Sequence, residues 1–514
     1  MPSTPLPLVA ALLLAACSKG GHDGAGERPP TGPSAGGPPP AAPAPTASVA
    51  CTPGSGTTYE IGPGKKLAKV TEVPWETLGP GDTVLIHHRA EPYREKIHLS
   101  SRGTPEQPIR VCGVRGPGGE LPVLDGADAI SRAESKFPYV PTQDRGLVVV
   151  TPRVGYKWGE RPGHILIQDL VLRGASGDEA TPVSFTNSEG KVVHYSRNAA
   201  AVFVERGEHI TVRGCTLTDS SYGLFVASGG SEEVMSREIL IEGNYIHGNG
   251  IVGVDRRHNV YAEAAGITFQ FNRFGPQRKG ALGNQLKDRS TGTIIRFNWI
   301  EGGAHLLDLV EPEESAAITV KDPRYHDTWV YGNVLISGPD DGSTLVHYGG
   351  DNGILPTYRK GTLHFYHNTV VVRADEGKRY QTTLLALETA DETADVRNNV
   401  FFRDGTTHLC ISRKKGKVVL GTNWITAGYE SLKYKDGDGV IEGEKELLLG
   451  ADTPFANLDG GDLRPGAASP IRAAGGPMPA DLPAEHAITT QYSPHQQAAP
   501  RAKSGPGANL GAFE

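Results

Sequence analysis

Four side chains that can exchange protons or bind charge recur at one position of a repeated strand pattern. They are Tyr261, Lys287, Asp308 and His347. Because successive residues of a strand face opposite sides of a sheet, we aligned the strand segments by their apolar residues. The outward column then reads Val226, Tyr261, Lys287, Asp308, His347 and Ala386. The inward column reads Phe225, Val260, Leu286, Leu307, Val346 and Leu385.

Lysine, arginine and tyrosine side chains in this arrangement suit a β-elimination. That reaction removes a proton next to a carboxylate, neutralises the carboxylate and returns a proton to the leaving oxygen. Lys287 is the candidate base, because the nearby Arg289 favours its neutral form. Arg289 could also bind a carboxylate through two hydrogen bonds. Tyr261 or a histidine, with His258 as a candidate, could return the proton.

Asp308, His347 and Arg257 are the candidate substrate-binding residues on the same coils. The whole column could instead be an ion-paired sheet face with no catalytic role. His258 could serve only to cap the start of a strand, in register with the starts of the neighbouring strands. Asp308 together with the acidic run after it could hold Ca²⁺ with oxygen ligands, or the run could be a solvated loop; its members are Glu311, Glu313 and Glu314. No other metal site or cofactor is predicted.

The elements that must position these residues are short strands in a repeat. Seven six-residue segments share one pattern: an apolar residue, any two residues, Asn or a small polar residue, any one residue and a final apolar residue. Their polar positions are spaced 26–35 residues apart and are Cys215, Asn244, Asn272, Asn298, Asn333, Asn368 and Asn399. A strand signal at this period without an intervening helical pattern predicts a solenoid of β-coils. We expect each Asn to adopt a left-handed conformation at a corner and its amide to bond to the Asn of the next coil.

This pattern resembles the right-handed parallel β-helix, the pectin-lyase-like fold, over roughly residues 57–514. The segments 80–86, 93–97, 103–104, 108–111 and 123–126 resemble the opening coils of bacterial β-helix polysaccharide lyases, and residues 469–470 and 510–514 resemble their closing segments. Trp75 and Leu78 predict a short helix that caps the first coil. The runs 258–261 and 285–290 also resemble a pairing found in β-helix proteins described as polysaccharide-degrading. They do not reproduce the catalytic pattern of the chondroitinase B or alginate lyase families.

Composition agrees with an all-β chain and excludes two other classes. The 514 residues include 66 Gly and 39 Pro, which excludes a helical bundle or coiled coil. The net charge of -7 provides no basic excess for nucleic acid. We expect a monomer.

The N-terminal residues predict a targeting signal followed by a tether. Residues 6–16 are an apolar stretch of signal-peptide length, and small residues before Cys17 resemble a bacterial lipobox. We therefore expect a signal peptide over 1–17, lipidation at Cys17, a disordered Gly/Pro/Ala-rich tether over 18–56 and the β-helix over 57–514. This organisation predicts a cell-envelope lipoprotein attached to a membrane by its lipid.

An oxidising compartment permits disulfides. Cys51 and Cys112 could join the tether to the first coils, whereas Cys215 lies in an apolar strand pattern and is expected to be a buried thiol.

Three functions follow from these observations. The first is a polysaccharide lyase-like enzyme that cleaves a uronate-containing glycan with Lys287, Arg289 and Tyr261. The second is a non-catalytic glycan-binding or scaffold protein of the envelope. The third is a β-helix glycoside hydrolase with Asp308 and Glu311 as its paired carboxylates.

Overall fold

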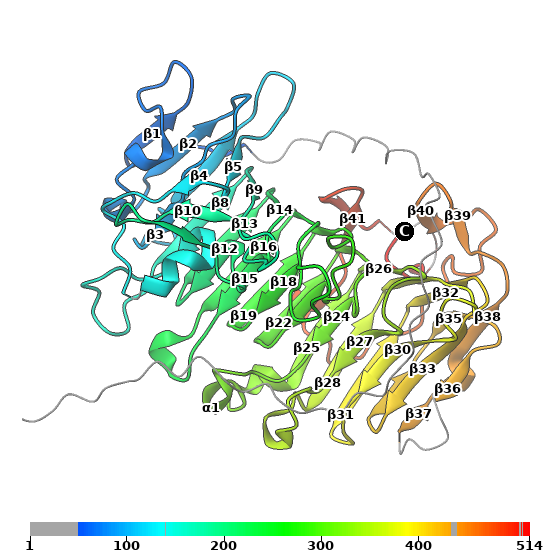
Figure 1. Ribbon diagram of the computed structural model, residues 1–514. Coiled ribbons are helices and arrows are strands. Elements are labelled where there is room, and N and C mark those ends of the chain that lie inside the picture. Colours follow the sequence, from blue (N-terminus) through cyan, green and yellow to red (C-terminus); the bar gives the residue numbers. More distant parts are fainter. Residues whose placement is uncertain (1–49, 139, 433–438, 503–504, 506) are drawn as a thin grey trace, which may run out of the picture. The chain divides into compact units, whose positions relative to one another are not determined.

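The computed structural model describes residues 50–138, 140–432, 439–502, 505 and 507–514. The predicted lipobox with Cys17 and residues 18–49 of the predicted tether lie outside the described residues. Three long parallel sheets run through the described chain, and consecutive strands pass from one sheet to the next (Figure 1). Pairing every strand with the equivalent strand one circuit later makes a right-handed parallel β-helix, as the sequence predicts.

The first sheet comprises β1 (Thr58–Ile61), β2 (Thr83–His87), β4 (Ile109–Val114), β8 (Gly163–Gln168), β13 (Glu208–Arg213), β16 (Arg237–Glu242), β19 (Ala265–Gln270), β22 (Thr291–Arg296), β25 (Asp327–Tyr331), β28 (Gly361–Tyr366), β31 (Glu392–Arg397), β34 (Lys417–Leu420) and β37 (Val440–Glu442). The second comprises β5 (Val123–Asp125), β9 (Val171–Arg173), β14 (Thr216–Thr218), β17 (Tyr245–Ile246), β20 (Arg273–Phe274), β23 (Trp299–Glu301), β26 (Val334–Ser337), β29 (Thr369–Arg373), β32 (Val400–Asp404), β35 (Asn423–Thr426) and β38 (Leu447–Gly450). The third comprises β3 (Ile97–Leu99), β7 (Gly146–Val150), β12 (Ala200–Glu205), β15 (Tyr222–Ala227), β18 (Val260–Ala262), β21 (Leu286–Asp288), β24 (Leu307–Leu309), β27 (Thr344–Tyr348), β30 (Gln381–Leu387), β33 (His408–Lys414) and β36 (Glu430–Leu432).

The remaining strands and the helices lie outside the three long sheets. The remaining strands are β6 (Ala129–Ile130), β10 (Ser184–Thr186), β11 (Val192–His194), β39 (Phe455–Asn457), β40 (Asp462–Pro465), β41 (Thr490–Ser493) and β42 (Gln497–Pro500). The described helices are α1 (Ala316–Thr319) and the 3-10 turns η1 (Val70–Glu72), η2 (Trp75–Thr77), η3 (Val140–Arg145), η4 (Glu232–Val234), η5 (Pro323–His326), η6 (Leu355–Thr357), η7 (Glu444–Glu446) and η8 (Ala484–His486). Within the described residues no helix is long and apolar enough to cross a membrane.

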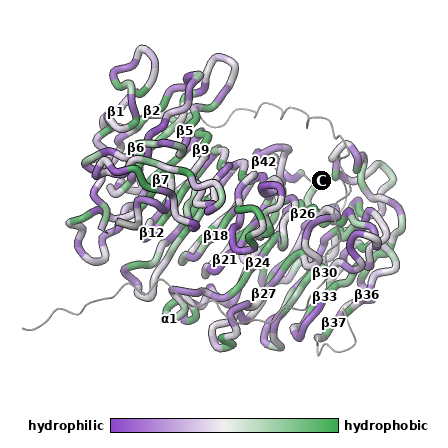
Figure 2. Tube along the Cα trace, viewed as in Figure 1, coloured by the Kyte–Doolittle hydropathy of each residue, from purple (hydrophilic) through white to green (hydrophobic). Residues whose placement is uncertain are grey.

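The inward-facing apolar side chains of successive coils fill the interior of the solenoid. Leu286 and Leu307 of the third sheet face Phe269 and Ile295 of the first in one continuous core. Burying one such side chain contributes about 1.5–3 kcal/mol. Figure 2 shows these hydrophobic segments within the strands and hydrophilic ones in many of the connecting loops.

The predicted asparagine ladder is confirmed and extends one coil further than expected. In each of the coils from Asn244 to Asn399, the side-chain Nδ2 donates to Oδ1 of the next ladder residue at 2.9–3.1 Å, and the ladder ends at Asn423. The expected left-handed conformation of the Asn is wrong. The residue before it adopts that conformation, for example Phe297 at φ 54° and Gly332 at φ 66°. The Asn itself is thereby free to direct its amide along the stack.

Substitution of an interior ladder residue should destabilise the fold. Asn333→Ala removes the side-chain donor to Asn368 and the acceptor for Asn298, and leaves buried polar groups unpaired at about 1–3 kcal/mol each. We expect the free energy of unfolding from chemical denaturation to fall by about 2–4 kcal/mol. Asn457→Ala, at the exposed end of β39, serves as the control, because it removes only one exposed hydrogen bond, from the backbone N–H of Gly460. A change at Asn333 no larger than that of the control would contradict a stabilising ladder.

Both ends of the solenoid carry additional attachments. A disulfide joins Cys51 to Cys112 of β4, a pairing that the sequence left open, and Cys215 is a buried thiol as expected. Where a capping helix was expected, the structure has the single 3-10 turn η2, which contacts the edge strand β3 and buries Trp75. At the other end, Leu510 and Phe513 pack on the outside of the second sheet, in a cluster with Trp424.

Candidate active site on the third sheet

The predicted column of polar residues exists on the third sheet. Tyr261 in β18, Lys287 in β21, Asp308 in β24 and His347 in β27 are direct partners in consecutive strand pairs. The next partner is Ala386, also as predicted. One end of the alignment is wrong, because Phe225 and not Val226 pairs with Tyr261. The Phe225 ring stacks on Tyr261 at 4.7 Å between centroids.

Lys287 points away from the apolar core and binds two carboxylates. Its Nζ lies 2.6 Å from Oδ2 of Asp308 and 2.5 Å from Oδ2 of Asp351. Only 7% of the residue is exposed. Its second partner, Asp351, comes from the loop 349–359 that follows β27. The segment between β24 and β25 contributes a different residue to the site, Glu313.

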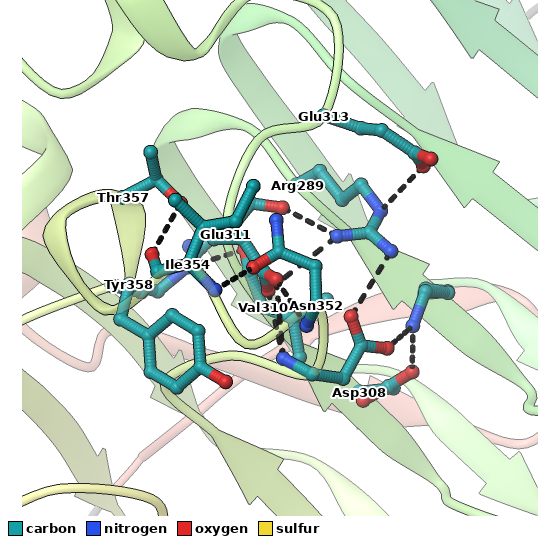
Figure 3. A network of polar contacts seen from close by, with 12 residues as sticks. Arg289, Asp308, Val310, Glu311, Glu313, Asn352, Ile354, Thr357 and Tyr358 are labelled. Carbon is teal, nitrogen blue, oxygen red and sulfur yellow. Dashed lines mark hydrogen bonds and ion pairs between the residues drawn. The ribbon is translucent and has the colours of Figure 1, made fainter. Parts of the chain in front are cut away.

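Arg289 lies two residues beyond Lys287 on the same face and gathers three acidic residues around it (Figure 3). Its Nη1 donates to the backbone oxygen of Glu311 at 2.6 Å, and its Nη2 donates to Oδ1 of Asp351 at 3.2 Å. Its Nε is 3.7 Å from Oε2 of Glu313. The Tyr261 hydroxyl donates to the same Glu313 oxygen at 3.2 Å. The guanidinium also lies 5.8 Å from the centroid of the Tyr261 ring.

The protonation of Tyr261 follows from these surroundings. Burial raises the pKa of the Tyr261 phenol well above its usual value, although Arg289 opposes the rise. At neutral pH the hydroxyl therefore keeps its proton and is a hydrogen-bond donor.

His347 joins the column to a further carboxylate. Its Nδ1 is 2.8 Å from Oδ1 of Asp308, and its Nε2 is 2.9 Å from Oε1 of Glu388. Burial disfavours the charged imidazolium, but the hydrogen bonds to these two carboxylates outweigh it and raise the pKa of His347 to about 9. Burial likewise disfavours ionised Asp308, yet Lys287 and His347 hold its pKa well below the usual range. Asp308 is therefore an anion between two cations at neutral pH.

The stability of the protein should depend on the charge of His347. A histidine whose pKa rises from 6.5 to about 9 on folding stabilises the fold fully below pH 6.5, and this contribution is lost as the pH rises through 9. Between pH 6.5 and 9, we expect the free energy of unfolding of the wild type to fall relative to that of His347→Gln, by as much as about 3 kcal/mol.

Chemical denaturation across this pH range measures the effect. His194→Gln, at an exposed histidine, should retain the pH dependence of the wild type. Parallel curves for the wild type and His347→Gln would contradict the assigned imidazolium.

His258 and Arg257 lie beside the column and make other contacts. Nδ1 of His258 accepts a hydrogen bond from the backbone N–H of Asn284 at 2.9 Å, as expected of a residue that caps the strand start. Burial and the nearby Lys287 lower the pKa of His258 to about 3, so its ring is neutral. Arg257 donates to the hydroxyl of Tyr222 at 3.3 Å. Among the described contacts, neither residue bonds to Lys287 or Arg289.

The acidic run, for which a Ca²⁺ site and a solvated loop were both open, does not converge on Asp308. The Glu311 carboxylate accepts hydrogen bonds from the backbone N–H groups of Asp351 and Asn352 and is fully buried. Glu314 interacts with Glu263; burial and that neighbouring carboxyl raise the pKa of Glu314 to about 8.

A different set of side chains could hold a metal ion. Ligand atoms of His305, Asp308 and His347 lie within 4.8 Å of one another. A cation there would compete with Lys287 and Asn284, which donate to Asp308 at 2.6 Å each.

Sequence reasoning missed Asp351 and Glu388. Asp351 follows two glycines in a loop, and Glu388 follows the last residue of β30. Neither occupies the strand position by which the column was found. The only sequence signal for Asp351 is a Gly- and Asp-rich turn, Gly349 to Gly353, on the coil that carries His347.

The three parallel sheets and their strand order make the chain a parallel β-helix protein. No protein-family model matches the sequence, and no curated protein matches it. Among solved structures, a pectate lyase is 10% identical, with 86% of this chain and 89% of that chain covered and a TM-score of 0.39. A lacto-N-biosidase from Eubacterium ramulus is 12% identical, with 76% and 67% covered and a TM-score of 0.39. An alginate lyase of the PL6 family is 13% identical, with 77% and 54% covered and a TM-score of 0.35. At these identities and scores the matches assign no activity.

Proposed function

We propose that this protein is a carbohydrate-active enzyme that cleaves a uronate-containing glycan by β-elimination on the outer face of the third sheet. One observation carries the proposal. The ammonium of Lys287 and the guanidinium of Arg289 lie side by side and are bridged by a single carboxylate, that of Asp351. Two cations that share one carboxylate form the kind of site that binds and neutralises the carboxylate of a uronate.

The reaction assigns one role to each group. Arg289 binds the uronate carboxylate, so that the adjacent C–H bond becomes acidic. Lys287 is an ammonium while it is paired with Asp308 and Asp351, so in this proposal it first releases a proton to solvent. The free amine then takes the proton from that C–H bond, while the electron pair of the bond forms the new double bond. The bond to the glycosidic oxygen breaks, and this oxygen takes a proton from Tyr261. The raised pKa of the Tyr261 hydroxyl keeps it in the donor form at neutral pH.

The supporting residues keep the two cations in place. Asp308 binds Lys287 and is itself bound by His347. Positioning by buried neighbours is what a catalytic lysine requires, because small displacements of reacting groups are costly. Asp308 and His347 are thus positioning residues in this proposal.

The alternative of a glycoside hydrolase that uses Asp308 and Glu311 is disfavoured by the position of Glu311. Its carboxylate is fully buried and bound to two backbone N–H groups, so it cannot flank a sugar linkage opposite Asp308. Binding of a glycan without turnover stays an outcome of the test below.

The predicted location follows from residues 1–17. We propose that Cys17 is lipidated and anchors the enzyme as a monomer in the cell envelope, where a polysaccharide is its partner. Incorporation of a labelled fatty acid that is lost in Cys17→Ser would support the anchor, and undiminished incorporation would refute it.

The activity is tested by incubating the protein with alginate, pectate and glycosaminoglycans. β-Elimination creates an unsaturated uronate, whose ultraviolet absorbance rises with time. We expect this rise with at least one uronate polymer and none with a neutral polysaccharide. Measurable binding of these polymers without any unsaturated product would reject the enzyme and favour a binding protein.

A further inference from the structure

The Asp351 side chain is the outer partner of both cations at the site. Its two oxygens contact Nζ of Lys287 at 2.5 Å and Nη2 of Arg289 at 3.2 Å. The Asp351 side chain is 36% exposed, whereas those of Lys287 and Arg289 are 9% and 7% exposed. Solvent therefore reaches this pair of cations from the side that Asp351 occupies.

The two cations have other partners that do not depend on Asp351. Asp308 holds Lys287 at 2.6 Å, and the backbone oxygen of Glu311 holds Arg289 at 2.6 Å. Loss of the Asp351 contact would leave both side chains attached to the sheet. The fold thus holds the pair from its inner side, and Asp351 is its partner on the outer side.

Hydrogen bonds hold the loop backbone around Asp351, and its side chain is partly exposed. The N–H groups of Asp351 and Asn352 donate to the buried Glu311 carboxylate at 3.0 and 2.6 Å. Arg359, at the end of the loop, donates its backbone N–H to Gly349 at 2.8 Å. The loop backbone is thus held independently of the Asp351 carboxylate, so loss of the contacts between this carboxylate and the two cations would not by itself release the loop.

We propose that the Asp351 carboxylate occupies the subsite of the substrate carboxylate and that a uronate must displace it to bind. Exchange of one carboxylate for another preserves the charge balance of Lys287 and Arg289 and replaces both hydrogen bonds. Asp351 is thus an internal competitor that keeps the two cations paired when no substrate is bound. The identity of the ligand as a uronate rests on the proposed function, whereas the carboxylate subsite rests on the geometry alone.

Binding of galacturonate and glucuronate monomers to the intact protein, measured by calorimetry or NMR titration, tests the proposal without requiring turnover. In Asp351→Ala we expect at least one of these uronates to bind about tenfold or more tightly than to the wild type, and galactose to gain nothing. Asp391→Ala is the matched control, because it removes an exposed carboxylate that pairs with Lys360. It should leave uronate binding unchanged.

The gain should disappear when Arg289→Gln is combined with Asp351→Ala. If Asp351→Ala folds poorly, Asp351→Asn removes the charge with little change in shape and should show the same direction. Uronate affinity that is equal to or below that of the wild type in a folded Asp351 variant would overturn the subsite. Tighter uronate binding with no unsaturated product from any polymer would retain the subsite and reject the lyase.

Discussion

Lys287→Ala is expected to lower the rate of unsaturated product formation by about 10²–10⁴-fold, the usual contribution of a general base. The amine is the group that accepts the proton in the proposed reaction, and no other described amine contacts Asp308 or Asp351. The initial rate of ultraviolet absorbance on the preferred polymer measures the loss.

Two further variants separate catalysis from folding in this experiment. Lys287→Arg keeps a cation between Asp308 and Asp351, and should fold normally but lose most of the activity, because a guanidinium does not release its proton. Lys415→Ala, at an exposed lysine, should retain the wild-type rate. A Lys287→Ala protein with undiminished turnover would exclude Lys287 as the base.

Arg359→Met is expected to lower the free energy of unfolding by about 3–5 kcal/mol, the cost of leaving a buried charge without its partner. Nη2 of Arg359 lies 3.1 Å from Oδ2 of Asp288, and both side chains are essentially inaccessible to solvent. Asp288 directly follows Lys287 in β21, and Arg359 ends the loop that carries Asp351. This ion pair therefore attaches the loop to the strand that bears the candidate base.

Chemical denaturation of matched variants measures the contribution of the buried pair. The double variant Asp288→Asn, Arg359→Met should be more stable than Arg359→Met alone, because it leaves no unpaired charge. Arg324→Met, which breaks an exposed pair with Asp322, should cost less than about 1 kcal/mol. An effect of Arg359→Met as small as that of Arg324→Met would show that the buried pair does not stabilise this region.

The parts of the fold that repeat are the parts that the sequence predicts. Spacing alone predicts the asparagine ladder, because each coil carries one such amide. The nearest equivalent amides lie on the coil before it and the coil after it. The left-handed residue at each corner was misplaced by one position. Phe271 and Phe297 occupy it on two of the coils, and a bulky aromatic residue does not indicate a left-handed conformation.

The register error at Phe225 has a different physical reason. Leu224, Phe225 and Val226 are all apolar, so the alternation that identifies the core face is lost there. A shift of one residue in a strand exchanges its two faces. Tyr261, Lys287, Asp308 and His347 were aligned correctly because each directly follows an apolar residue that faces the core.

The rest of the site was not predictable from strand periodicity. Asp351 reaches Lys287 across 64 residues of sequence, from a loop that carries no repeat signal. Glu388 reaches His347 from the coil after it. The placement of Glu311 toward the loop backbone, rather than toward substrate, depends on three-dimensional contacts that residue type does not encode.

The most direct test of the central claim is the source of the atoms in the cleaved product. A uronate oligosaccharide digested in heavy-oxygen water and examined by mass spectrometry distinguishes the two ways of breaking a glycosidic bond. β-Elimination adds no water, so we expect products without heavy oxygen, and one of them should bear an unsaturated uronate at its new end. Heavy oxygen in every newly formed reducing end, with no unsaturated product, would establish hydrolysis and contradict this account.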